Sequence, residues 1–490
     1  MDLHVSGAAR LNDNDYLFGR GAAWFAFVMT CGLMLFDYID RQVIVSLFPH
    51  LKDEWGLSDK QLGALASIVS VTVALAGIPV ALAADRFSRV KSIAVMALGW
   101  SLASISCMFT GGFSQLVTAR GVVGLGEAGY GSVGAVLIAS HFPSRMRGAL
   151  MAAFLACASF GSVLGVMLGG VIAAHWGWRA AFGVVGVPGL VLALLYMKVR
   201  DYRTVSLTPR EPAARPSRGT ARFIVQQLLN SRTLLWLCLA APAQVILVSS
   251  MWSWLPSYLH RVHGLATDQA AIRASLVVLC GAAGMVFWGA VADRAARSRP
   301  RVKLQVVGLL CAVSAVVLSF AFGAPRLGVA LGMQAQFGLI ALGGFFMACI
   351  SGVVTAVAIE VVHPGIRSTG AFVLSLFQNL LGLAAGPFIT GWLSDVWSLE
   401  MALTVIPAFG LLAAGLFIIT SRCYEADLKR VDTDLPHAGQ HFIRRRVDRC
   451  KCLKVANVAD HVGREAADQP VGVGPNDPVY MSVRLDGHVS

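Results

Sequence analysis

Long apolar stretches recur along this chain, and short polar segments that hold most of the charged residues separate them. Each stretch has roughly 20 predominantly apolar residues, which is enough for a helix to cross a hydrocarbon core of about 30 Å. Twelve such stretches lie near residues 22–44, 61–83, 91–112, 115–140, 148–173, 179–198, 233–256, 272–292, 303–323, 328–359, 368–393 and 401–420. The pattern therefore predicts an all-α membrane protein with twelve transmembrane helices.

A polar segment over residues 202–231 separates six apolar stretches from six. It contains three prolines and has no helical stripe of apolar residues, as expected of a linker. The sequence Ala-Asp-Arg ends the second stretch of each half, at residues 84–86 and 292–294. Parallel repeats of this kind are typical of transporters built from two rocking bundles with the solute site between them. A chance repeat is the alternative.

The composition and the placement of charge both favour a membrane protein. Hydrophobic residues make up 56% of the chain and charged residues only 14%, unlike a soluble protein. The net charge is +13, but Lys and Arg concentrate in alternate loops, near residues 86–91, 145–147, 198–232 and 294–303. By the positive-inside rule these loops and both termini are cytoplasmic. We expect a multi-pass protein of a bacterial inner membrane, in contact with membrane lipid and not with nucleic acid.

Five segments are expected along the chain. A cytoplasmic N-terminal segment covers residues 1–20, an N-terminal six-helix bundle 21–200, and a cytoplasmic linker 201–231. A C-terminal six-helix bundle covers residues 232–422, and a polar tail, expected to be cytoplasmic and disordered, covers 423–490. The two bundles are expected to be pseudo-symmetric, and the chain to act as a monomer.

The sequence GLGEAG at residues 124–129 matches the glycine fingerprint of a dinucleotide-binding loop. That loop also needs a preceding strand and an acidic residue about 20 positions further on. Here no Asp or Glu occurs between Glu127 and Asp201. The chain also lacks a metal-spaced histidine cluster, a Gly-x-Ser-x-Gly elbow and a Gly-Lys-Ser/Thr phosphate loop. We therefore expect no cofactor, no metal site and no enzyme activity.

Arg120 and Glu127 are the charged residues of the apolar stretch over 116–140. They are seven residues apart, so they share a helix face at about 10 Å along the axis, too far for direct neutralisation. Charged side chains at membrane depth are costly and usually face a cavity or a partner. Arg120 is predicted to bind an anionic group of a solute, and Glu127 to hold a proton. A buried structural charge network is the alternative.

The first apolar stretch adds three charged residues, Asp37, Asp40 and Arg41. Asp37 and Arg41 are four residues apart and can pair, while Asp40 lies on a partly different face. Both carboxylates are candidates for proton binding or for pairing with Arg120 across the cavity. The alternative is a charge pair near the outer interface that only anchors the helix.

Polar and aromatic residues in the second half are weaker candidates for solute binding. They are Gln244 and Trp252 in the stretch over 233–256, and Gln378 and Asn379 in the stretch over 368–393. Each such residue more often packs between helices than binds a ligand, so packing is the alternative for all four.

The sequence GIPVALAADRFSRVK at residues 77–91 resembles the signature that follows the second helix of the major facilitator superfamily. Asp85 is expected to lie at the positive N-terminal end of the helix that opens near Arg367 in the other half. Arg86 and Arg89 can bind carboxylates or carbonyls beside it. The set is expected to act as a gating latch, and a solvated charge cluster that only fixes topology is the alternative.

Pseudo-symmetry predicts a second latch. Asp293, followed by Arg294, is expected to meet the start of the helix over residues 148–173, near Arg147. The two latches would then change partners as the halves rock.

Several motifs together resemble the Spinster-like branch of the major facilitator superfamily, with the organic-anion symporters as a close second resemblance. They are DYIDR at 37–41, GLSDKQLG at 56–63, ADRFSR at 84–89, RGVVGLGEAGYGS at 120–132, FPSRMRG at 142–148 and GWRAAFGVVGVPGL at 177–190. The superfamily resemblance spans roughly residues 20–422 and implies the major facilitator fold. It also implies that Asp40, Arg120 and Glu127 serve coupling and solute binding. Asp37 stands where the branch commonly has asparagine.

These observations favour a secondary active transporter, coupled to protons, that moves a small organic acid or a related catabolite, including an aromatic-derived one, by alternating access. An exporter of lysophospholipid or another amphiphile is one alternative, and a lateral apolar opening of the cavity would favour it. A sensor that uses the transporter fold without transporting is a further alternative. A channel or a membrane-bound enzyme has less support, because a channel does not need two rocking halves.

Overall fold

The computed structural model describes residues 19–86, 88–200, 226–297, 299–329, 331–363 and 366–431. The expected N-terminal segment, linker and tail lie largely outside these described residues. In the described part of the chain, twelve helices are long and apolar enough to cross a membrane, so the predicted fold class is confirmed.

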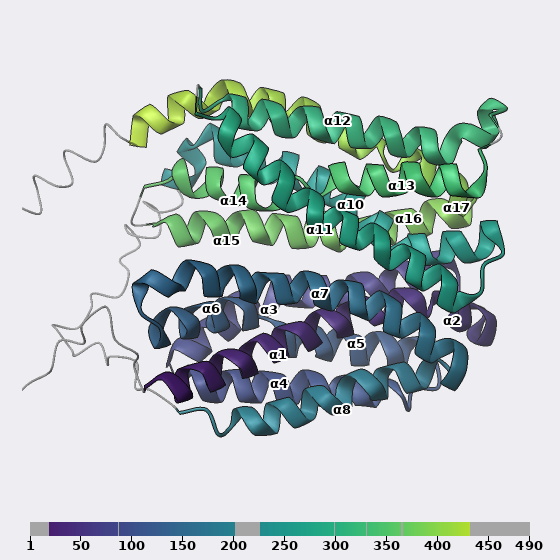
Figure 1. The fold of residues 1–490 in the computed structure, drawn as a ribbon, viewed down its shortest axis with the longest axis horizontal. Coiled ribbons are helices and arrows are strands. Elements are labelled where there is room, and N and C mark those ends of the chain that lie inside the picture. The colour runs from purple at the N-terminus through teal and green to yellow at the C-terminus, as the bar shows by residue number, and fades with distance from the viewer. Residues whose placement is uncertain are drawn as a thin grey trace, which may run out of the picture. The chain divides into compact units, whose positions relative to one another are not determined.

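The first half contributes six of these spans (Figure 1). They are α1 (Arg20–Ser46), α3 (Asp59–Arg86), α4 (Arg89–Cys107), α5 (Phe113–Glu127) with α6 (Tyr130–His141), α7 (Ser144–Trp176) and α8 (Trp178–Tyr196). The short helix α2 (Phe48–Trp55) connects α1 to α3. The end of the molecule at which α2 lies is called the α2 end below, and the opposite one, where α1 begins, the Arg20 end.

The second half contributes the other six spans. They are α10 (Arg232–His263), α11 (Thr267–Ala295), α12 (Val302–Gly323), α13 (Met333–Met347) with α14 (Ser351–Glu360), α15 (Arg367–Phe377) with η3 (Gln378–Leu383) and α16 (Ala385–Val396), and α17 (Leu399–Val405) followed by a helix over 408–431. A 3₁₀ turn, η1 (Ala324–Leu327), follows α12, and η3 is a π-helical segment.

Local sequence explains where α3 begins. Gly56 ends α2 in the left-handed conformation that favours glycine, with φ of 61°. The Ser58 N–H then donates to the Gln61 side chain at 3.0 Å, and the Gln61 N–H donates to Ser58 Oγ at 3.2 Å. This reciprocal pair is a capping box, which fixes the first turn of α3 at Asp59.

Glycines spaced by four residues hold α7 close to α1. A Cβ on Gly161, Gly165 or Gly169 would come within 2.5, 2.6 or 2.8 Å of a carbonyl oxygen of α1. No larger residue fits there without moving one helix, so the glycines set the separation of the two backbones.

Two apolar stretches that the sequence predicts as single helices are broken in the middle. The stretch over 115–140 forms α5 and α6, and between them Gly129 has φ of 84°. The stretch over 328–359 forms α13 and α14, with the break at residues 348–350. Each break falls in the fourth span of its half, so the pseudo-symmetry extends to the breaks.

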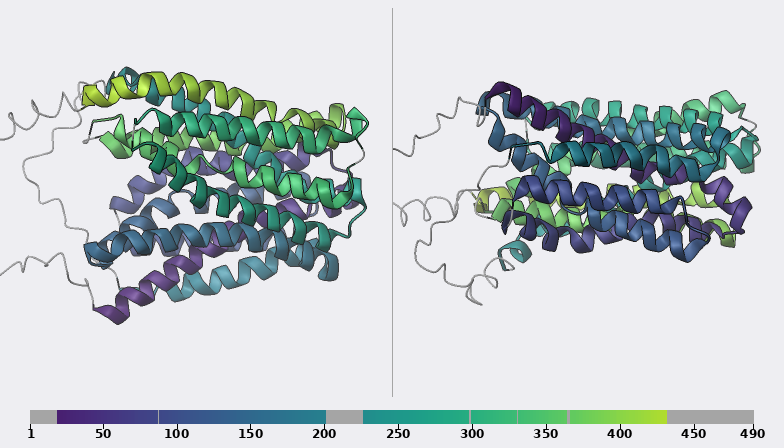
Figure 2. Two further views of the ribbon diagram at one scale, coloured as in Figure 1. Left: turned by 45° about the horizontal axis from the view of Figure 1, so that its top comes forward. Right: turned by 90° about the horizontal axis from the view of Figure 1, so that it is seen from below.

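The two bundles contact each other along the pairs α7–α11 and α3–α16. Figures 1 and 2 show the first-half helices, purple to teal, gathered beside the green and yellow helices of the second half. A Cβ on Gly170 would lie 2.2 Å from Ala271 of α11, and one on Gly63 would lie 2.4 Å from the carbonyl oxygen of Pro387. Both close approaches lie toward the α2 end.

Candidate functional site

One face of α5 carries Arg120 and Glu127 into the interior of the first bundle. Arg120 is fully buried and Glu127 is 2% exposed, and Val123 between them is buried on the same face. The two charged residues do not contact each other; each has its own partner on α1. The sequence-based expectation that they share a face but do not pair directly is therefore met.

Asp40 of α1 is the partner of Arg120. The Arg120 guanidinium lies 3.3 Å from the Asp40 carboxylate and donates to the Asp40 backbone carbonyl at 3.0 Å. Ser104 of α4 donates to the other carboxylate oxygen at 2.5 Å. Asp40 is 1% exposed, so this ion pair is closed off from solvent in the conformation described here.

Arg41 joins the other two carboxylates of the site. Its Nε lies 3.2 Å from Asp37 of the same helix and 3.0 Å from Glu127 of α5. The guanidinium also lies over the Tyr38 ring, at 5.3 Å from its centroid. The contact with Asp37 was expected from their spacing, whereas the contact with Glu127 joins two helices and was not.

Asp37, Asp40, Arg41, Arg120 and Glu127 together form a buried charge cluster. It holds three carboxylates and two guanidinium groups, so it has one carboxylate in excess when all are ionised. An uncompensated charge in a low-dielectric interior is costly, and such residues within a membrane usually mark ion or solute pathways. The side chain of Arg41 is 19% exposed and the other four are at most 4% exposed.

The break in the fourth span lies directly beside this cluster. Glu127 is the last residue of α5, and the backbone turns at Ala128 and Gly129 before α6 begins. The last carbonyl groups of a helix have no helical hydrogen-bond partners and carry the negative end of its dipole. The fold thus places a buried carboxylate next to partial negative charge.

The candidate residues of the second half lie in different environments. Gln244 is buried and its amide donates to the Met347 carbonyl at 3.0 Å, at the end of α13 where that span breaks. Trp252 is half-buried on the same helix. Gln378 begins the π-helical segment, and the Asn379 amide donates to the Ser375 carbonyl one turn earlier, at 2.8 Å.

The residues of the first predicted latch lie at the end of α3 and at the starts of α4 and α15. Asp85 and Arg86 form the end of α3, and their side chains lie outside the described residues. Arg89 begins α4 and is half-buried. Arg367 begins α15, where its side chain is exposed.

The residues of the second predicted latch bind within their own bundles in this conformation. Asp293 forms an ion pair with Lys303 at 3.0 Å, and Arg294 beside it is exposed. Arg147 donates to the Phe142 carbonyl at 3.0 Å. The structure therefore does not join Asp293 to the start of α7 in the conformation it describes.

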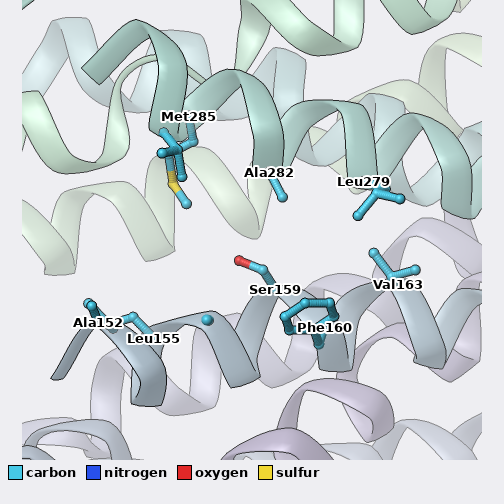
Figure 3. Close-up of a pocket in the computed structure, with 10 residues that line it drawn as sticks. Ala152, Leu155, Ser159, Phe160, Val163, Leu279, Ala282 and Met285 are labelled. Atoms are coloured by element: carbon cyan, nitrogen blue, oxygen red, sulfur yellow. The ribbon is translucent and has the colours of Figure 1, made fainter. Parts of the chain in front are cut away.

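An apolar cavity of about 250 Å³ lies between α7 and α11 (Figure 3). Ser159 is the one residue with a polar side chain among the described residues that line it. The larger apolar side chains around it are Leu155, Phe160, Val163, Leu279, Met285 and Val286. The cavity lies on the Arg20 side of the contact between Gly170 and Ala271.

Comparisons with known proteins agree with this architecture. The chain matches the Major Facilitator Superfamily over residues 30–383. It is 25% identical over 402 residues to the hexuronate transporter of Bacillus subtilis (strain 168), covering 81% of this chain and 92% of that protein. It is 24% identical over 429 residues to protein spinster homolog 1 of Xenopus tropicalis, covering 81% of this chain and 80% of that protein.

Among solved structures, the fold is similar to that of a bacterial homolog to the human lysosomal transporter Spinster, in an inward-facing and unoccupied conformation. The TM-score is 0.74 at 21% identity, and the match covers 84% of this chain and 99% of that one. The resemblance inferred from the sequence motifs is thus confirmed. Members of this family carry small-molecule solutes through the membrane and are transport proteins, not enzymes. With the family match spanning most of its length, the chain belongs to the Major Facilitator Superfamily.

Proposed function

We propose that this chain is a proton-coupled secondary transporter of a small organic acid or a related catabolite, working by alternating access. The observation that carries the proposal is the buried charge cluster, in which three carboxylates share two guanidinium groups. Positive-inside charge supports a location in a bacterial inner membrane with both termini cytoplasmic. The protein acts as a monomer in this proposal, with lipid, solute and protons as its partners.

The charge count of the cluster gives a reason for coupling. The nearby tyrosine and cysteine side chains, Tyr38, Tyr130 and Cys107, carry no charge near pH 7. Without solute, one proton on a carboxylate makes the cluster neutral. A singly charged organic anion adds one negative charge, and a second proton restores neutrality. Because an unbalanced buried charge is costly, solute and proton bind together.

The exposure of the side chains suggests how the solute is bound. Arg41 is the most exposed member of the cluster, so it makes the first contact with a solute anion. Arg120 is held by Asp40, and it reaches the solute when the anion competes with Asp40 for the guanidinium. Glu127 lies at the negative end of α5 and takes up the proton that enters with the solute, which releases Arg41 to the anion, while the proton of the solute-free cluster stays on Asp37. Asp37 takes part in the coupling because it binds the same Arg41 guanidinium as Glu127.

Trp252, Gln378 and Asn379 are the solute contacts that we assign to the second bundle. Gln244 is assigned to packing, since its amide already donates to Met347 beside the broken span. The latch residues around Asp85 and Asp293 pair across the bundles when the Arg20 end closes, and in the present conformation Asp293 binds Lys303.

The proposal is tested by flux through the purified protein. The protein is reconstituted in liposomes that contain a pH-sensitive dye, and mixed pools of organic acids, aromatic breakdown products and lysolipids are added outside in turn. Acidification of the interior with an organic-acid or aromatic pool is expected, because solute and proton enter together. No proton or solute movement with any pool would contradict the proposal and favour a sensor.

One observation favours a second candidate, the transport of a lysophospholipid or another amphiphile. The apolar cavity between α7 and α11 lies at the junction of the two bundles and has the chemistry to hold an acyl chain. The cluster would then bind the anionic headgroup. Movement of the lysolipid pool alone in the same liposomes would establish this candidate in place of the first.

A further inference from the structure

A network centred on Asp59, the first residue of α3, joins the two bundles at the α2 end. The Arg261 guanidinium of α10 donates to both carboxylate oxygens of Asp59, at 2.7 and 2.9 Å. Ser394 of α16 donates to the same carboxylate at 2.6 Å, and Lys52 of α2 also donates at 2.6 Å. Asp59 is 3% exposed, and a shielded bidentate pair of this kind is among the stronger ionic contacts in proteins.

A second carboxylate, from the other bundle, caps the same helix. The two oxygens of Asp395, on the last turn of α16, accept the backbone N–H groups of Asp59 and Lys60, each at 2.8 Å. The first N–H groups of a helix have no helical partner and carry the positive end of its dipole. Asp395 therefore stabilises the start of α3 only while α3 and α16 stay together.

The backbones of α3 and α16 are in direct contact beneath these charges. A Cβ on Gly391 would lie 2.2 Å from the Asp59 carbonyl oxygen, and Gly63 makes a similar approach to Pro387. Ser67, two turns further along α3, donates to the Ala384 carbonyl at 2.5 Å. The α2 end is thus closed by backbone packing as well as by charge.

Contacts at the Arg20 end contrast with this arrangement. Asp293 and Arg147 bind Lys303 and Phe142, which belong to their own bundles. The apolar cavity between α7 and α11 also lies toward this end. In the described conformation the bundles are therefore joined by charge and backbone contacts at the α2 end, and a cavity lies between α7 and α11 toward the other end.

We propose that Asp59, Arg261 and Asp395 form the gate of the α2 end, and that their contacts break and reform once in each transport cycle. The gate is separate from the charge cluster, so it acts on conformation and not on solute or proton binding. Asp59 and Asp85 stand at opposite ends of α3, about 39 Å apart along the helix axis. One helix thereby supplies an acidic residue to the closure of each end.

The gate is tested by measuring the distance between the bundles at the α2 end. Probes are attached at Asp53→Cys on α2 and Gln269→Cys on α11, both exposed, after replacement of the ten native cysteines. The short distance is expected to dominate in the otherwise unaltered protein. Asp59→Asn is expected to raise the ratio of long to short distances at least about tenfold, the change that corresponds to about 1.4 kcal/mol. Asp395→Asn is expected to shift this ratio in the same direction. Because Asp395 is exposed, the substitution leaves folding intact.

Glu54→Gln is the matched control. Glu54 accepts from Trp178 at 2.5 Å and Arg179 at 2.8 Å, and these contacts hold its pKa below the usual range. Glu54→Gln therefore removes an ionised carboxylate at the α2 end. The partners of Glu54, Trp178 and Arg179, both belong to the first bundle. Unchanged distances are expected. The proposal is overturned if both Asp59→Asn and Asp395→Asn keep the original distances, or if Glu54→Gln shifts them equally.

Discussion

Replacement of Glu127 by Gln is expected to abolish uptake driven by a pH gradient while solute exchange between equal pools continues. Glu127 is buried and lies 3.0 Å from Arg41, and glutamine has nearly the same shape but cannot bind or release the proton. Gradient-driven uptake should fall at least about 100-fold, equivalent to about 2.7 kcal/mol in the barrier. Exchange needs no net proton movement and should change only a few-fold. Both rates are measured with labelled solute in the same liposomes.

Glu54→Gln serves as the control for this experiment too, since Glu54 belongs to the first bundle but lies outside the cluster, bound to Trp178 and Arg179. It should leave both rates near those of the original protein. Gradient-driven uptake that survives in Glu127→Gln would show that Glu127 has a structural role and that the proton binds elsewhere.

Arg120→Ala is expected to destabilise the protein by about 3–5 kcal/mol, because it leaves the buried Asp40 carboxylate without its cation. The Ser104 hydrogen bond remains but carries no positive charge. The combined variant Arg120→Ala with Asp40→Asn removes both charges, so it should recover a large part of the loss. Thermal unfolding of the two variants and of Asp40→Asn alone, in one detergent at neutral pH, measures the coupling between the residues.

Equal destabilisation of the single and the combined variants would contradict this explanation. It would mean that Arg120 stabilises the bundle by packing of its long side chain and not by neutralising Asp40. Recovery in the combined variant without recovery of transport would instead separate the structural part of the pair from its part in the cycle.

The fold was predictable because lipid leaves a chain few options. Backbone groups within a bilayer must bond internally, so each long apolar stretch becomes a helix. The breaks at 128–129 and 348–350 were not predicted, because both sides of each break are equally apolar and glycine is common in membrane helices. The breaks depend on packing between helices, which periodicity along one helix does not reveal.

The candidate site was predictable only in part. Asp37 and Arg41 are one helical turn apart, so their pairing follows from spacing, and the charged residues of α5 were conspicuous in an apolar stretch. The bridge from Arg41 to Glu127 depends on how α1 lies against α5. The Asp59 gate was missed for the same reason: its partners Arg261 and Asp395 follow at separations of 202 and 336 residues, and each resembles an ordinary loop charge.

The number of protons taken up as solute binds tests proton coupling most directly. Calorimetric titration of the purified protein in two buffers of different ionisation enthalpy gives that number for the solute identified by flux. One proton for each singly charged organic anion is predicted, since the cluster is already neutral with one proton and the anion adds one negative charge. Solute binding with no proton uptake would contradict the coupling assigned to Asp37, Asp40 and Glu127.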